Sequence, residues 1–144
     1  MQMLINCLLV GAGGALGSIA RYLLTLVAPL PLGQDGAPGL RWIPEQATLF
    51  PFMTLFINIA GSFAIGAIMG TCVRSGALPD EAVLFLKVGV CGGFTTFSTF
   101  SLETMQLLQT GHPALAIAYA AISAIACVAA AFAGHSLGCA LQLR

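Results

Sequence analysis

The chain alternates four long apolar stretches with shorter polar connections, and this pattern predicts four helices. The apolar stretches run over about 3–28, 49–73, 81–110 and 113–141, and the second and fourth contain no charged residue. A bilayer core about 30 Å thick is crossed by about 20 helical residues, so each stretch is long enough to span a membrane. We therefore expect an all-α membrane protein in which 1–144 form a single four-helix transmembrane domain.

The connections between these stretches set the expected topology. Residues 29–47 hold four of the seven prolines, so we expect an extended loop there, with short turns at 74–80 and 111–113. No Lys or Arg precedes the first stretch, which favours a retained helix over a cleaved signal peptide. An even number of spans places both termini and the 74–80 turn on one side of the membrane.

Few charges distinguish the two sides of this expected topology. Three basic residues fall on the side of the termini and two on the other, namely Arg74, Lys87 and Arg144 against Arg21 and Arg41. Cytoplasmic loops normally carry an excess of Lys and Arg, and three against two is a weak bias. The charges leave open both a fixed orientation and insertion in either orientation, and the second would permit an antiparallel dimer of inverted copies.

Composition narrows the classes of function. Hydrophobic residues make up 58% of the chain and charged residues 7%, with a mean hydropathy of +0.97, whereas a soluble domain has about a quarter charged residues. The formal net charge is zero, so we expect no basic surface for nucleic acid. The sequence has no Ser/His dyad, paired carboxylate or metal-ligand spacing, and its five cysteines include no CxxC pair. We therefore expect a protein that is not an enzyme.

The segment with the most unusual composition lies inside the third stretch, at residues 92–101. It reads Gly-Gly-Phe-Thr-Thr-Phe-Ser-Thr-Phe-Ser and combines five hydroxyls, three phenylalanines and a glycine pair. Glycine favours an interruption of the helix, and polar groups in the hydrocarbon region must face protein, water or an ion. Phe97 and Phe100 project from one side of a helix, and their positively polarised ring edges can contact an anion weakly, as conduction requires.

Polar residues in the second and fourth stretches form two further stripes. Asn58 is the strongly polar residue in the middle of the second stretch, with Thr54 and Ser62 four residues to either side. Its amide is either a clamp between helices or a donor into a pore. Hydroxyls on such stripes either face other helices or bond the carbonyl four residues earlier. The stripe of the fourth stretch consists of Tyr119, Ser123 and Cys127.

Three charged residues and three glycine pairs leave alternatives open. Arg21 is either an interfacial anchor or a cation in the vestibule of an anion pathway, and Lys87 has the same two interpretations. Glu103 either caps a helix or braces a cation. Glycines four residues apart allow close approach of helices, within one chain or between chains. These pairs are Gly13 and Gly17, Gly66 and Gly70, and Gly134 and Gly138.

Three segments resemble the Fluc-type bacterial fluoride channels, also called the CrcB family. They are Ser-Ile-Ala-Arg-Tyr at 18–22, Phe-Ile-Asn-Ile-Ala-Gly-Ser-Phe at 56–63, and the highly specific 92–101 motif followed by Glu103. The resemblance covers nearly the whole chain. It implies a fluoride-selective anion channel, a multi-pass protein among the lipids of the bacterial cytoplasmic (inner) membrane. Such a channel exports cytoplasmic fluoride passively and reduces fluoride toxicity.

The resemblance also implies an assembly and a set of site residues. It implies an antiparallel dual-topology homodimer, with the third helix broken near the bilayer centre. A structural sodium ion would lie at the dimer centre, held by the backbone carbonyls of Gly92 and Thr95, because carbonyl oxygens suit a hard cation. Arg21 is a possible vestibule cation, and Cys127 departs from the hydroxyl expected at its position. The residues implied for the fluoride pores are Asn58, Thr96, Phe97, Ser98, Thr99, Phe100, Tyr119 and Ser123.

A small four-helix multidrug or cation exporter is the alternative function. A proton-coupled exporter requires an acid embedded in the membrane. The first two stretches contain no Asp or Glu, which counts against this alternative.

Overall fold

The structure, a computed structural model, describes residues 1–27, 50–75 and 78–141. The expected all-α membrane class is confirmed, because four helical stretches are long and apolar enough to cross a membrane. These are Gln2–Leu26, Phe52–Cys72, Asp80–Gln109 and Pro113–Leu141. The loop predicted at 29–47 lies outside the described residues, and so does Arg144.

Three of the four spans are single helices, and the third is divided. The single helices are α1 (Gln2–Val27), α2 (Phe52–Ser75) and α6 (Pro113–Leu141). The third span consists of α3 (Asp80–Val83), the π-helix η1 (Leu84–Cys91), α4 (Gly92–Phe94) and α5 (Phe97–Gln109). Gly111, with a φ of 81°, makes the turn between α5 and α6, in a conformation that glycine adopts without strain.

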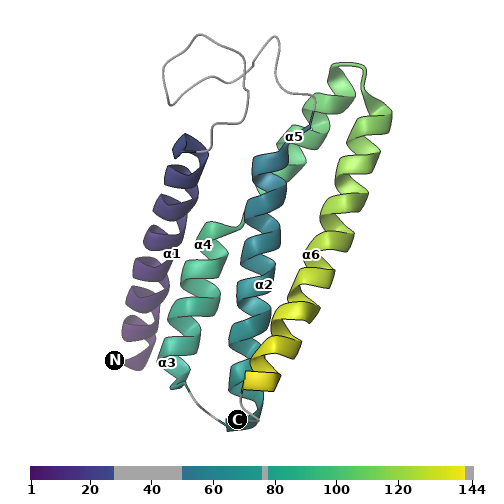
Figure 1. Ribbon diagram of the computed structural model, residues 1–144. Helices are drawn as coiled ribbons and strands as arrows, with labels where there is room; N and C mark the ends of the chain where they lie inside the picture. Colours follow the sequence, from purple (N-terminus) through teal and green to yellow (C-terminus); the bar gives the residue numbers. More distant parts are fainter. Residues whose placement is uncertain (28–49, 76–77, 142–144) are drawn as a thin grey trace.

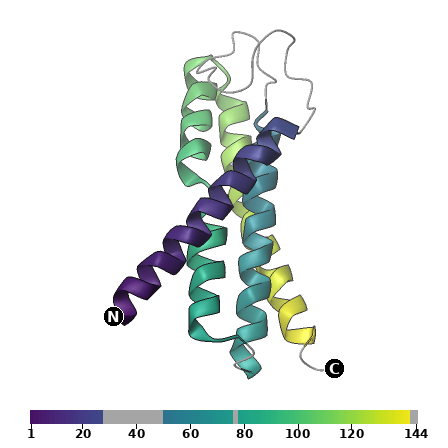
Figure 2. The same cartoon turned by 90° about the vertical axis from the view of Figure 1, so that its left-hand side faces the viewer.

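The spans lie side by side in an up-and-down arrangement. Figure 1 shows α1 beside η1 and α4, α2 between α4 and α6, and α5 beside the upper part of α6. The start of α1, the end of α2, the start of α3 and the end of α6 lie at the lower end, as an even number of spans requires. Figure 2 shows α1 crossing the third span obliquely.

The interior of the molecule is small, and much of its apolar surface faces outward. Ile57 on α2 and Tyr119 on α6 are the largest fully buried side chains among the described residues. Large apolar side chains such as Ile125 and Phe132 are 71% and 72% exposed. Such exposure suits a chain whose outer surface contacts lipid rather than water.

Glycines bring the helices into backbone contact. A Cβ atom added to Gly66 would collide with the Ala131 carbonyl, and one added to Gly134 would collide with the Phe63 carbonyl. A Cβ atom on Gly17 would likewise collide with the backbone of η1 and α4. In lipid, helices associate through such close packing, because no hydrophobic effect acts between them. The glycine pairs therefore pack helices within one chain.

The third span is interrupted at Thr95 and Thr96, which have extended backbone. Their φ and ψ angles are −80° and 157° at Thr95 and −149° and 114° at Thr96, so one helix ends at Phe94 and the next begins at Phe97. Thr96 is the N-cap of α5, because its Oγ1 accepts the backbone N–H of Thr99 at 3.2 Å. The interruption directs α5 away from the line of α4 and onto α6, whereas α4 remains against α1 (Figure 1).

Candidate functional site

Asn58 on α2 holds the interrupted backbone of the third span. Its Nδ2 donates to the Thr96 carbonyl oxygen at 3.2 Å, and the Thr96 N–H donates to its Oδ1 at 2.9 Å. In a continuous α-helix the Thr96 N–H would bond the Gly92 carbonyl, four residues earlier. The amide takes the place of that carbonyl, so Gly92 loses its usual donor. One of the two interpretations of Asn58, a clamp between helices, is therefore present in the structure.

The hydroxyls of residues 92–101 divide into two groups. Thr95 and Ser101 donate to the carbonyls four residues earlier, at 2.9 and 2.8 Å, as hydroxyls in apolar helices often do. The Thr96 hydroxyl instead lies 3.0 Å from Thr99 Oγ1 and 3.2 Å from Ser98 Oγ. Ser98 and Thr99 thus belong to the hydrogen-bonded start of α5.

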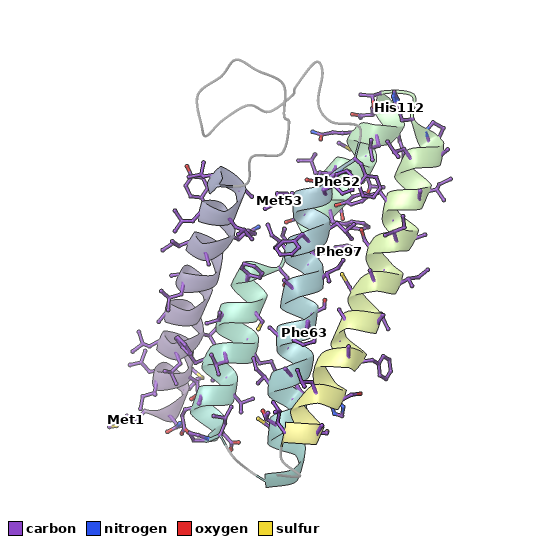
Figure 3. The ribbon with its side chains drawn as sticks, viewed as in Figure 1. Met1, Phe52, Met53, Phe63, Phe97 and His112 are labelled. Atoms are coloured by element: carbon purple, nitrogen blue, oxygen red, sulfur yellow. The ribbon has the colours of Figure 1, made fainter. Side chains whose placement is uncertain are left out.

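A groove of about 360 Å³ lies beside the interruption, between α2, the third span and α6. Three of the residues that line it, Gly92, Phe97 and Ala124, are exposed, and the Phe97 side chain is 79% exposed. Figure 3 shows Phe97 near the middle of the molecule, at the level where α4 ends. The polar groups and rings that line the groove belong to Asn58, Ser62, Cys91, Thr95, Thr96, Phe97, Phe100, Ser123 and Cys127.

Ser123 supplies a free hydroxyl to this groove. Its side chain is 6% exposed, and its Oγ has no hydrogen-bond partner among the described residues. An unsatisfied buried polar group costs about 1–3 kcal/mol, so such a group requires an explanation. A hydroxyl that lines a groove without a protein partner can donate to an anion in that groove.

Glu103 lies behind the groove and joins three spans. Its Oε1 accepts the Thr54 hydroxyl from α2 at 2.7 Å, and its Oε2 accepts the Tyr119 hydroxyl from α6 at 2.7 Å. The carboxylate therefore accepts hydrogen bonds from two neutral donors, and within the described part of the chain it does not brace Arg or Lys. Two short hydroxyl bonds are a strong means of fixing a carboxylate in apolar surroundings.

The structure brings five of the eight expected pore residues to the groove and leaves three of them, and the expected vestibule residue Arg21, elsewhere. Asn58, Thr96, Phe97, Phe100 and Ser123 line it, together with Gly92 and Thr95, the residues expected to hold sodium. Tyr119 does not line the groove, because its hydroxyl is directed at Glu103. Ser98 and Thr99 do not line it either, and Arg21 lies half-buried on α1, away from the lining.

Sequence reasoning missed Gly61 as a residue of the site. A Cβ atom added there would collide with Thr95 Cγ2, so the glycine makes room for Thr95 at the interruption. The sequence could have indicated this role, because Gly61 lies in the 56–63 segment, one helical turn after Asn58.

Comparisons with known proteins identify the family of the chain. The family described as "CrcB-like protein, Camphor Resistance (CrcB)" matches residues 8–135. A protein of Nitrobacter winogradskyi named "Fluoride-specific ion channel FluC" is 45% identical over 127 residues, which cover 88% of this chain and 90% of the relative. Proteins of the same name from Thermus thermophilus and Anaeromyxobacter dehalogenans are 46% and 44% identical, covering 93% and 90% of this chain and 95% and 92% of the relatives. The family match over residues 8–135, together with these relatives, shows that the chain belongs to the CrcB family.

Proposed function

We propose that the chain is a fluoride-selective channel of a bacterial membrane, which releases cytoplasmic fluoride passively down its electrochemical gradient. One observation carries this proposal: the groove combines the free Ser123 hydroxyl and the Asn58 amide with the rings of Phe97 and Phe100. The relatives named as fluoride-specific ion channels support it. Transport leaves the ion unchanged, so no enzymatic chemistry is involved.

The lining suits fluoride because the ion is small and strongly hydrated. Removing its water requires hydrogen-bond donors. The Ser123 hydroxyl and the Asn58 N–H that does not bond the Thr96 carbonyl can supply them. The edges of Phe97 and Phe100 add weak attraction without a full charge, so the ion can also leave. Chloride is larger and gains less from each short hydrogen bond, which favours fluoride in a narrow donor-lined path.

The pathway is completed by a second, inverted copy of the chain. The groove is open where Gly92 and Phe97 are exposed, and an antiparallel homodimer would cover it there. In such a dimer the interruption at Thr95 and Thr96 lies near the bilayer centre, and Arg21 lies near a mouth of the path. The test is protease access to a C-terminal tag in sealed and permeabilised vesicles. Protection of about half of the tags is expected, and uniform access or protection would contradict the inverted arrangement.

A structural sodium ion fits the carbonyls at the interruption. Among the described residues no group of three or more His, Cys, Asp or Glu side chains could hold a metal ion, and the family resemblance implies backbone carbonyls as the ligands. Gly92 has lost its usual donor, and a Cβ atom built on it meets nothing within 4 Å. The carbonyl oxygens of Gly92 and Thr95 from two copies would hold the ion. Its positive charge would be attracted to the negative ends of these carbonyl dipoles. Higher thermal stability in sodium than in a large organic cation is expected, and equal stability would contradict the site.

The proposed function is tested by efflux from liposomes with a fluoride electrode. Vesicles loaded with fluoride should release it when the purified protein is present, and vesicles loaded with chloride should retain it. Protein-free vesicles are the control. Equal release of both ions would reject fluoride selectivity.

The alternative, a proton-coupled multidrug exporter, lacks support. Neither α1 nor α2 contains Asp or Glu. Glu103 is held by two hydroxyls and is not free to exchange a cation for a proton.

A further inference from the structure

Five aromatic rings form a continuous column that extends past the groove. Successive ring centroids are 5.4 Å apart for Phe97 and Phe100, 5.3 Å for Phe100 and Tyr119, 5.4 Å for Tyr119 and Phe50, and 4.7 Å for Phe50 and Phe52. All four distances lie in the range of stabilising aromatic pairs. The column therefore connects the exposed Phe97 to Phe50, which lies just before α2.

Tyr119 is the central ring of this column. Its side chain is completely buried, its hydroxyl donates to Glu103 at 2.7 Å, and its ring contacts Phe100 on one side and Phe50 on the other. A tyrosine ring has two side-chain torsions, so contacts with two rings and one hydrogen bond determine its position. The Phe50 contact is edge-to-face, with an interplanar angle of 83°.

We propose that Phe50 is a positioning residue of the fluoride pathway, which acts through Tyr119. It holds the Tyr119 ring against Phe100 and the Tyr119 hydroxyl on Glu103. This inference rests on the proposed function, and it assigns a role to a residue that does not line the groove.

Removing the Phe50 ring would affect Phe100 through Tyr119. Without Phe50 the Tyr119 ring can tilt, and Phe100 then loses the surface that keeps its ring at the groove. An edge-to-face aromatic pair contributes the equivalent of about a two- to tenfold change in an equilibrium constant. We therefore expect fluoride efflux to slow by about two- to tenfold when the ring at position 50 is removed.

The experiment compares fluoride and chloride efflux from liposomes that contain wild-type protein or variants. Phe50→Leu keeps an apolar side chain of similar volume but removes the ring, Phe50→Ala removes both, and Phe50→Tyr keeps the ring. Phe132→Ala, on the exposed surface of α6, is the matched control for loss of a phenylalanine ring. Tyr119→Ala and the double variant Phe50→Leu/Tyr119→Ala test whether the two residues act together.

We expect slower fluoride efflux and a lower ratio of fluoride to chloride efflux rates in Phe50→Leu and Phe50→Ala. Phe50→Tyr and Phe132→Ala should have fluoride efflux rates within about twofold of wild type. The double variant should be no slower than Tyr119→Ala, because Phe50 acts through that ring. Normal efflux by Phe50→Leu, or additive losses in the double variant, would overturn the inference alone. Absence of fluoride efflux from wild type would instead overturn the proposed function and this inference with it.

Discussion

Replacing Asn58 with leucine tests whether one amide holds the interruption of the third span. Leucine has a similar size, but it removes both the 3.2 Å bond to the Thr96 carbonyl and the 2.9 Å bond from the Thr96 N–H. Thr96 is 9% exposed, so little solvent can replace these partners. An unsatisfied buried polar group costs about 1–3 kcal/mol, and the two together should lower the free energy of unfolding by about 2–6 kcal/mol.

The measurement is unfolding of the purified protein by SDS titration in detergent micelles, for wild type, Asn58→Leu and Ser62→Ala. Ser62 lies one turn further along the same face of α2 and makes neither of the bonds to Thr96. Its replacement should cost about 1 kcal/mol or less. If Asn58→Leu were no less stable than Ser62→Ala, the reasoning would be refuted, because the interruption would then be held by other contacts.

Three further predictions follow from the groove and the helix contacts. Phe97→Ile and Phe100→Ile should each slow fluoride efflux without changing the oligomeric state on size-exclusion chromatography, and unchanged rates in both would remove these rings from the pathway. Asn58→Asp should slow efflux by roughly a thousandfold. The Asp carboxylate and a fluoride ion about 4 Å away would repel by about 4 kcal/mol at an effective dielectric constant of about 20. Normal efflux would show that Asn58 is a packing residue. Gly134→Ala should lower the free energy of unfolding by about 1–3 kcal/mol in the same assay, because its Cβ would enter the backbone of α2. Gly14→Ala should have little effect, because no atom of the described chain lies within 4 Å of its Cβ.

Much of the fold could be predicted from the sequence because hydropathy alone determines which segments can cross a membrane. The glycine pair and the hydroxyls of 92–101 also indicated an interruption, and the structure has extended backbone at Thr95 and Thr96. The role of the glycine pairs could not be decided, because spacing along one helix does not identify the helix that approaches it. The structure places Gly66 and Gly134 at contacts within one chain.

The arrangement of the candidate site was less accessible to sequence reasoning. The spacing of Tyr119 and Ser123 correctly placed them on one face of α6, yet Ser123 lines the groove and Tyr119 bonds Glu103. That difference depends on the direction in which α5 leaves the interruption, which no local pattern encodes. The pairing of Asn58 with the Thr96 backbone depends equally on the relative register of two helices.

The adjacent glycines at 92 and 93 differ in a way that has an experimental use. A Cβ atom on Gly93 would collide with the backbone of α1, whereas one on Gly92 would meet no atom of the described residues within 4 Å. Side chains of increasing size at position 92 should therefore leave an isolated subunit intact. The size at which transport stops would measure the clearance between this position and the second copy in the proposed dimer.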